Sequence, residues 1–330
     1  MKNLLDKISG LKVLVIGDIM LDHYIIGDVT RISPEAPVPV VAVERDKYAL
    51  GAAANVALNV ARLGCHTELI GTIGQDRSGE IVKNLLAENG ISFNMNFVSP
   101  TTSTIKKTRV VVRGQQLCRI DREDNRLNYE MAKIVPLGEI CKRIEFVDAV
   151  ILSDYAKGIL TNSNVVKFIE AAERGNAFIA IDPKPINKLS FSGVALMTPN
   201  MAEAMQLAGI DLAGADKFPE KKTCESILRK YSPKNLVITL GPDGMLAVGE
   251  DKKILRIPTR AREVFDVSGA GDTSIACLTL ALASGESLAD AAKFANIAAG
   301  IVVSKHGTAA VSVPELLSLG NEYPTVSDPA

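Results

Sequence analysis

The stretch best suited to chemistry begins at Asp266 and reads DVSGAGDT, followed by the apolar run SIACLTLALA. The apolar run predicts a buried helix that starts at the glycines. Small residues such as Gly269, Ala270 and Gly271 let backbone N–H groups close on an anion, which the positive end of the helix dipole also favours. A carboxylate at Asp272 would stand beside that anion, so we interpret it as a base that takes a proton from an attacking hydroxyl. The alternative is a glycine-rich turn in which Asp272 caps the helix.

Other chemistries have little support. The three histidines are isolated, and the five cysteines are scattered without a CxxC or Cys/His spacing, which argues against nucleophilic hydrolysis and structural zinc. We expect the cysteines to be reduced. No GxxxxGK[ST] loop occurs, and the late glycines do not form a dinucleotide-binding fingerprint.

Composition narrows the class of protein further. The 330 residues carry a net charge of −1, with 47% hydrophobic and 23% charged residues, as in ordinary globular proteins. This balance predicts no nucleic-acid or membrane-surface partner, because both need a broad basic field. The apolar stretch Val13–Leu21 is interrupted by Gly17 and Asp18, so we expect no signal peptide and a cytoplasmic protein.

The elements that must position these residues alternate between strand and helix. Short β-branched runs predict buried parallel strands, and periodic stretches between them predict helices, so we expect an open doubly wound α/β sheet. The predicted strands are Lys12–Gly17, Thr67–Ile73, Asp148–Leu152, Ala177–Ile181, Val194–Met197 and Leu236–Leu240. The predicted helices are Asn55–Leu63, Ser78–Asn89, Met131–Ile144, Thr161–Arg174, Met201–Ala208, Pro219–Tyr231 and most of Gly271–Ser304.

Two segments break this alternation. Residues 24–43 and 105–121 are strand-like with little helical pattern, which predicts antiparallel strands off the main sheet. Pro34, Pro37 and Pro39 suit an edge or turn, because proline cannot donate to a sheet ladder. We interpret the two segments as a small β lid.

A second glycine-containing stretch reads GAAANVA from Gly51, followed by Gly64 and Gly74. Together with the stretch around Asp272, it resembles the paired signatures of the ribokinase or PfkB family of carbohydrate kinases. The resemblance implies a three-layer ribokinase-like fold and a homodimer. The family's paired glycine reads Gly51-Ala52 here, so the second glycine is lost.

Further motifs narrow the resemblance to the heptose-7-phosphate kinase branch of that family. They are GDIMLD at 17–22, RISPEAPVPV at 31–40, QQ and RID at 115–121, LSDYAKG at 152–158, DPK at 182–184 and TPN at 198–200. Related kinases are often fused to an adenylyltransferase. Because the sequence ends soon after the kinase pattern, we expect residues 1–330 to form a single stand-alone kinase domain without an adenylyltransferase domain.

The resemblance also implies roles for individual residues at the phosphate end. Asp272 is then the catalytic base, with Gly269, Ala270 and Gly271 as the anion hole. Asn200 and Glu203 match an NxxE element that helps to organise Mg²⁺, often through water, and the phosphates of ATP. The alternative for this pair is a helix cap with its capping-box partner.

The nucleotide and sugar contacts follow from the same resemblance. Thr239, Gly241 and Gly244 match a nucleotide loop and Asn296 would border the adenine, with ordinary turn and helix packing as the alternative. The sugar contacts are Asp18, Asp22, Gly51 and Asn55, with Arg31, Lys157 and Lys184 as further candidates for the phosphate. A turn aspartate and an N-cap asparagine are the alternatives at Asp22 and Asn55.

A local excess of positive charge suggests that the sugar is phosphorylated. Between residues 106 and 126 seven basic side chains face three acidic ones, an excess of 7 − 3 = +4. Arginine and lysine side chains bind phosphate well. The alternative is that these charges lie at strand edges and only discourage aggregation. The seven are Lys106, Lys107, Arg109, Arg113, Arg119, Arg122 and Arg126.

The expected reaction is transfer of the ATP γ-phosphoryl group to the C1 hydroxyl of D-glycero-D-manno-heptose 7-phosphate, in the synthesis of ADP-heptose for lipopolysaccharide. Two alternatives remain open. The acceptor is another sugar, such as fructose 6-phosphate or ribose, because phosphoryl-transfer signatures do not specify the hydroxyl. Otherwise the chain is a non-catalytic sugar-phosphate or nucleotide sensor on the same fold.

Overall fold

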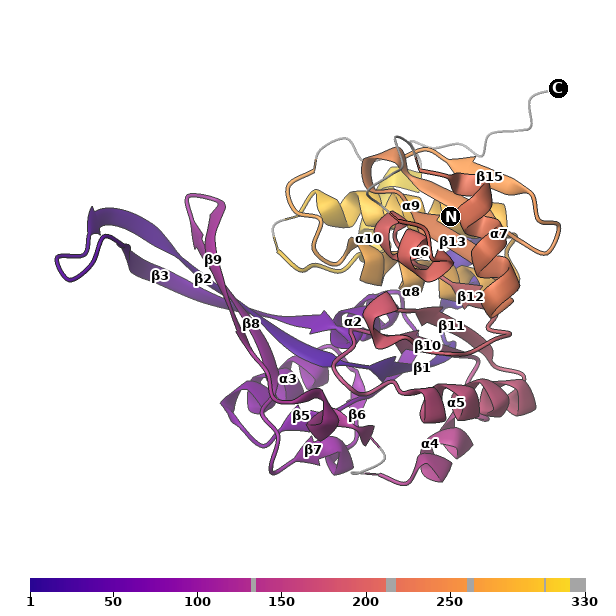
Figure 1. Ribbon diagram of the computed structural model, residues 1–330, viewed down its shortest axis with the longest axis horizontal. Coiled ribbons are helices and arrows are strands. Elements are labelled where there is room, and N and C mark those ends of the chain that lie inside the picture. The colour runs from indigo at the N-terminus through magenta and orange to yellow at the C-terminus, as the bar shows by residue number, and fades with distance from the viewer. Residues whose placement is uncertain (132–134, 212–217, 260–263, 306, 321–330) are drawn as a thin grey trace.

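The chain folds around a central sheet that is nine-stranded in the part of the chain the structure describes (Figure 1). The structure is a computed structural model, and it describes residues 1–131, 135–211, 218–259, 264–305 and 307–320. Across the sheet the strands are β15 (Ile254–Ile257), β14 (Met245–Val248), β13 (Asn235–Thr239), β12 (Leu196–Met197), β11 (Phe178–Asp182), β10 (Ala149–Ser153), β1 (Lys12–Gly17), β4 (His66–Ile70) and β6 (Ser92–Phe93).

The six strands predicted from sequence form and are mutually parallel, with the predicted bounds met for β1 and shifted by a few residues elsewhere. Every residue of β10 is buried, as expected for a parallel strand covered on both faces. Three strands of this sheet were not predicted: the two-residue β6 and the antiparallel strands β14 and β15, of which β15 lies at the edge. The first three residues of β15 are exposed, so it carries no buried hydrophobic run.

Helices cover both faces of this sheet. Alternate residues of β1 go to opposite sides: Val13 and Val15 join one hydrophobic core, whereas Leu14 and Ile16 join the other. The three-layer α/β fold is therefore confirmed. The first core is covered by α1 (Lys2–Ile8), α2 (Ala53–Arg62), α3 (Arg77–Glu88), α8 (Ala270–Ala283), α9 (Leu288–Val303) and α10 (Val313–Gly320). The second is covered by α4 (Leu137–Ile144), α5 (Asn162–Gly175), α6 (Met201–Ala208) and α7 (Glu220–Tyr231).

One predicted helix was too long at its start. Residues 131–144 were expected to be helical, but α4 begins only at Leu137, after Pro136. Proline restricts the residue before it to extended conformations, which favours a helix boundary there. Upstream, the chain forms a 3₁₀ turn at Arg126–Tyr129, and residues 132–134 lie outside the described part. No helix among the described residues is long and apolar enough to cross a membrane.

A second sheet, here called the outer sheet, extends away from the helix-covered body (Figure 1). Its strand order is β3 (Pro39–Ala52), β2 (Ile19–Ile32), β8 (Ile105–Val112) and β9 (Gln115–Arg122). The strand-like segments predicted at 24–43 and 105–121 thus lie off the main sheet, as expected for a small β lid. The pairs β2–β3 and β8–β9 are antiparallel, but β2 and β8 pair in parallel, which corrects the expectation of an all-antiparallel lid.

The junction of β3 with α2 explains the departure from the paired glycine. Ala52 caps α2 with φ 54° and ψ −131°, a conformation that glycine adopts far more readily than alanine. At Gly51 a Cβ atom would lie 2.7 Å from Asp22 Oδ2, so only glycine fits there without movement of that carboxylate. Glycine is thus present at position 51, where a side chain would not fit, and the alanine at position 52 has a strained backbone conformation.

Candidate active site

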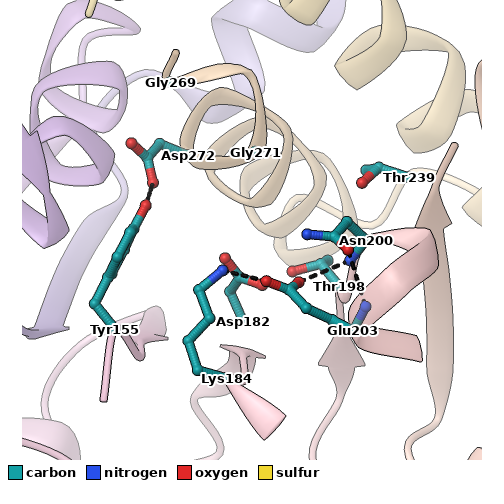
Figure 2. Close-up of a pocket in the computed structure, with 10 residues that line it drawn as sticks. All are labelled: Tyr155, Asp182, Lys184, Thr198, Asn200, Glu203, Thr239, Gly269, Gly271 and Asp272. Carbon is teal, nitrogen blue, oxygen red and sulfur yellow. Dashed lines mark hydrogen bonds and ion pairs between the residues drawn. The ribbon is translucent and has the colours of Figure 1, made fainter. Parts of the chain in front are cut away.

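A pocket lies where the carboxyl ends of the central strands meet the start of α8 (Figure 2). This edge is where open α/β sheets bind ligands. Its polar side chains come from the ends of β11 and β13, from the loops after β10, β11 and β12, and from the first turns of α6 and α8. The lining residues are Tyr155, Asp182, Lys184, Thr198, Asn200, Glu203, Thr239, Gly269, Gly271 and Asp272.

Asp272 is buried in the first turn of α8, and both of its carboxylate oxygens accept hydrogen bonds. The Asn55 amide donates to Oδ2 over 2.8 Å, and the Tyr155 hydroxyl donates to Oδ1 over 2.7 Å. Burial raises the pKa of Asp272 to about 6, although these two hydrogen bonds and the Lys184 charge oppose the shift. The group is therefore mostly ionised at neutral pH and accepts a proton more readily than an exposed aspartate.

The glycine-containing loop before Asp272 leaves room for an anion. Gly269 begins α8 with φ +85°, and a Cβ there would lie 2.8 Å from Asn55 Nδ2. A Cβ at Gly271 would meet nothing within 4 Å, so this position opens onto free space. The first N–H groups of a helix have no intrahelical partner and favour negative charge. The start of α8 therefore has room for an anion, and the role of Gly269, Ala270 and Gly271 as an anion hole stays a prediction.

Asn200 and Glu203 line the pocket and also form the capping box considered as their alternative. The Glu203 N–H donates to Asn200 Oδ1 and the Asn200 N–H donates to Glu203 Oε2, each over 2.9 Å. Glu203 also forms an ion pair with Lys184. The capping role is therefore real. It does not remove either side chain from the pocket wall.

Asp182 is a pocket residue that sequence analysis quoted in a motif but gave no role. It ends β11, and burial, together with the charges of Glu203 and Asp272, raises its pKa well above the usual value despite Lys184. Its carboxylate has no hydrogen bond or ion pair to the residues the structure describes. A carboxyl group at the end of a buried parallel strand was the signal that could have identified it.

The residues fit phosphate and magnesium ligands in kind. No group of three or more His, Cys, Asp or Glu residues that could hold a metal is found among the described residues. Mg²⁺ usually keeps several of its waters in proteins and is bound through few side chains. Thr198 Oγ1, in the pocket wall, and Asn55 Oδ1, beside Asp272, are buried and have no hydrogen-bond partner in the part of the chain that the structure describes. Buried polar atoms are normally paired, so both atoms suit a polar ligand.

The sugar-side residues Asp22 and Arg109 lie on the outer sheet and contact each other. Arg109 Nη1 donates to Asp22 Oδ1 over 2.5 Å, and the Thr308 hydroxyl donates to Asp22 Oδ2 over 2.7 Å. The Thr308 N–H also donates to the Tyr24 hydroxyl over 2.8 Å. This buried network, in which Tyr24 and Thr308 were not predicted, joins the outer sheet to the segment before α10.

The basic cluster is less positive than its composition suggested. Arg109, Arg113 and Arg119 each form an ion pair, with Asp22, Asp28 and Asp121 respectively. Lys157 lies outside that cluster and pairs with Glu123. By contrast, Lys107 has no hydrogen bond or ion pair to a described residue, and its ammonium lies 5.7 Å from the centre of the Tyr155 ring. Burial lowers the pKa of this half-buried lysine, although Asp22 and Asp121 oppose the shift.

Three predicted substrate residues are not among the residues that line the pocket. Both oxygens of the buried Asp18 accept backbone N–H groups of the loop after β10, so it positions that loop. Arg31 is exposed near the distal end of β2 and does not line the pocket. Arg119 is exposed and donates from Nε and Nη2 to the two carboxylate oxygens of Asp121.

Some of the predicted nucleotide residues line the pocket and others do not. Thr239 lines the pocket, whereas Gly241 and Gly244 belong to the 3₁₀ turn after β13 and are not among its lining residues. A Cβ at Gly244 would lie 2.0 Å from the Ile257 carbonyl oxygen, so packing requires that glycine. The Asn296 amide donates to the Pro258 carbonyl over 2.6 Å, which is the helix-packing alternative.

Solved structures show the class of fold. The structure of ribokinase from Arabidopsis thaliana, complexed with ribose and ATP, superposes with a TM-score of 0.71 at 18% identity, covering 94% of this chain and 98% of that one. Phosphofructokinase-2 from Escherichia coli gives a TM-score of 0.75 at 19% identity over 95% of this chain and 99% of that one. The fold is therefore ribokinase-like.

Sequence comparison gives the family. Residues 11–316 match the pfkB family of carbohydrate kinases, and the chain belongs to that family. Relatives named "Bifunctional protein HldE" are 40% identical in Sulfurimonas denitrificans, over 92% of this chain and 63% of that protein, and 42% identical in Caulobacter vibrioides, over 93% and 63%. The chain thus spans less than two thirds of the length of these relatives. As a family member it is a phosphotransferase that acts on a carbohydrate.

Proposed function

We propose that the chain transfers the γ-phosphoryl group of ATP to the C1 hydroxyl of D-glycero-D-manno-heptose 7-phosphate, giving the 1,7-bisphosphate. The product would enter ADP-heptose synthesis for lipopolysaccharide. The main support for phosphoryl transfer is the setting of Asp272. Its buried carboxylate accepts a hydrogen bond at each oxygen and lies beside the open start of α8. The relatives named HldE support the branch of the family, since they are 40% and 42% identical over 92% and 93% of this chain.

In the proposed reaction Asp272 accepts the proton of the C1 hydroxyl. The sugar oxygen then bonds to the γ-phosphorus, the bond from that phosphorus to the β–γ bridging oxygen breaks, and ADP leaves. Backbone N–H groups at Gly269, Ala270 and Gly271 stabilise the charge on the transferring group. Such positioning and electrostatic stabilisation account for most of the rate enhancement in phosphoryl transfer.

The acceptor would lie between the outer sheet and Tyr155. Residues paired across strands share a face, and Lys107 lies opposite Asp22 on one side and Asp121 on the other. The next aligned set on this face contains Tyr24, Arg109 and Arg119. A phosphate bound against this face would give the unpaired ammonium of Lys107 a partner, with Arg109 beside it.

ATP and Mg²⁺ would occupy the opposite end of the pocket. Thr239 would border the nucleotide, and Asn200, Glu203 and Asp182 would hold Mg²⁺ through its waters. When bound, Mg²⁺ supplies positive charge that offsets the phosphate oxygens. Lys184, which lines the pocket beside Asp182, would contact a phosphate directly.

We also propose that a second copy of the chain packs against the outer sheet. Its strands carry exposed apolar side chains, and large exposed apolar patches are uncommon on monomers. Sedimentation equilibrium tests this, with a dimer expected and a monomer at micromolar concentration contradicting it. The side chains are Ile32, Val38, Val43, Tyr48, Leu117 and Ile120.

The acceptor is tested by coupled ATP consumption with phosphosugar detection. Heptose 7-phosphate, unphosphorylated heptose, fructose 6-phosphate and ribose are compared at one Mg²⁺ concentration. We expect heptose 7-phosphate to have the highest kcat/KM by orders of magnitude. A higher value for another sugar would retain the kinase and reject the heptose assignment, and no turnover with any acceptor would favour a sensor.

A further inference from the structure

The loop after β10 is held in place by a buried carboxylate beneath it. Asp18, in the connection between β1 and β2, accepts the N–H groups of Tyr155, Lys157 and Ile159 over 2.9, 3.1 and 3.2 Å. Asp18 is fully buried and is not itself among the residues that line the pocket. The backbone of Tyr155 therefore has a fixed position relative to the central sheet.

The side chain of Tyr155 reaches from this loop to Asp272 (Figure 2). Its hydroxyl and the Asn55 amide each bind a different oxygen of the same carboxylate, at 2.7 and 2.8 Å. Two donors on different oxygens fix the rotation of a carboxylate about its Cβ–Cγ bond. An ionised carboxylate has about four acceptor positions, so the remaining ones stay available for an acceptor hydroxyl.

Two ammonium groups also lie near the Tyr155 ring. The ammonium groups of Lys107, on β8, and Lys184, after β11, lie 5.7 and 5.2 Å from the ring centre, within the range of cation–π attraction. The tyrosine thus contacts cations from the outer sheet and from the central sheet while it binds Asp272.

We propose that Tyr155 is a positioning residue for Asp272: its hydroxyl fixes the carboxylate and favours the ionised form, and Asp18 acts through Tyr155 by holding its backbone. The inference rests on the proposed role of Asp272 as base. It assigns a function to a tyrosine that lies within the LSDYAKG motif but was given no role there, and it adds a positioning role for Asp18, which was expected to contact the substrate.

The electrostatic setting makes this hydrogen bond important. Burial of Asp272 disfavours its charged form, and Asp22 adds to that effect, while Lys184 opposes it. Tyr155 in turn is influenced by Asp272, Asp182 and Asp22, which together with burial raise its pKa well above the usual value. The hydroxyl therefore remains a donor across the working pH range. A donor that binds the charged form lowers the pKa of the acceptor group.

The test is the pH dependence of kcat/KM in Tyr155→Phe, which keeps the ring near the two ammonium groups and removes only the hydroxyl. We expect the acid limb to move to higher pH by about one unit, which is about tenfold in the protonation equilibrium. Tyr231→Phe is the matched control, because Tyr231 is a buried tyrosine that packs on Phe191, outside the pocket. Its profile should match that of the wild type.

A Tyr155→Phe profile that keeps the wild-type limb, at any overall rate, would overturn the proposal, because a packing role changes rate without changing the protonation of Asp272. Thermal melts establish that the variants are folded. The Asp18→Asn variant provides a second test. We expect the acid limb of its kcat/KM profile to move in the same direction, and we expect the double variant with Tyr155→Phe to show no further shift. Additive shifts would reject the action of Asp18 through Tyr155.

Asp272→Asn separates this inference from the proposed reaction. If that variant retains turnover, Asp272 is not the base, and both the proposed reaction and this inference are rejected. If it loses turnover and Tyr155→Phe leaves the limb in place, only the inference is rejected.

Discussion

Replacement of Lys107 by methionine tests whether the outer sheet recognises the phosphate of the acceptor. The ammonium is half-buried, has no ion pair among the described residues and lies on the face that carries Asp22 and Arg109. Methionine keeps much of the length and the apolar stem while removing the charge. The substitution should therefore leave packing against Tyr155 largely intact and remove one charge from the proposed phosphate site.

The size of the effect follows from the setting of the lysine. Two unit charges 4 Å apart attract by about 4 kcal/mol at an effective dielectric constant of 20, and part of this is spent on desolvation. A hydrogen bond to a charged group retains about 1.5–3 kcal/mol, which is about 10- to 150-fold in kcat/KM. Because Lys107 is already partly desolvated in the structure, we expect the upper half of this range.

The assay compares phosphorylated and unphosphorylated heptose in wild type and variant. The loss should appear with heptose 7-phosphate and stay below about threefold with unphosphorylated heptose, because only the former offers the charged partner. Lys106→Met is the matched control, since adjacent residues of a strand point to opposite faces. An equal loss with both acceptors would refute phosphate recognition by Lys107.

Three further outcomes are expected. Asp272→Asn should lower kcat by at least about 100-fold with ATP affinity nearly unchanged, measured by steady-state kinetics and calorimetry. Because burial raises the pKa of Asp272 to about 6 and the protonated form cannot act as base, kcat/KM should be flat well above that pH and fall about tenfold per unit below it. Ala52→Gly should lower the free energy of unfolding, measured by heat or urea, by at least about 1 kcal/mol less than Ala57→Gly, a buried helical control. The reason is that glycine at position 52 relieves backbone strain of about 1–3 kcal/mol at φ 54°.

The parts of the fold that sequence predicted are those with a local signature. Buried parallel strands such as β1 and β10 are continuous hydrophobic runs, and their bounds were found within a residue. The parallel pairing of β2 with β8 has no such signature, because it depends on which strand is brought alongside from far away in the chain. The exposed edge strand β15 lacks a buried run and was missed for that reason.

The same distinction applies to the site. Asp272 was identified because its neighbours Gly269 and Gly271 are adjacent in sequence and have a physical task there. Tyr155 was given no role, because its relation to Asp272 exists only after β10 and α8 have packed. The count of charges on β8 and β9 overestimated the positive charge that is available to a ligand. Arg119, for example, forms an ion pair with Asp121, two residues further along β9. Composition counts charges, whereas function depends on which of them remain unpaired.

Five buried aspartates at this edge of the sheet show how the fold divides their tasks. Burying a carboxylate is costly unless hydrogen bonds or cations compensate. Asp18 and Asp154 accept backbone N–H groups and hold loops, and Asp22 is bound by Arg109 and Thr308.

Only the other two aspartates, Asp182 and Asp272, line the pocket. Asp272 is held by neutral donors that leave acceptor positions open, and Asp182 has no partner among the described residues. A carboxylate whose charge is compensated by the protein is available for structure. One that is left incompletely compensated at the pocket wall is available for a proton or for a hydrated cation, and this difference separates the two pocket aspartates from the three whose charges the protein compensates.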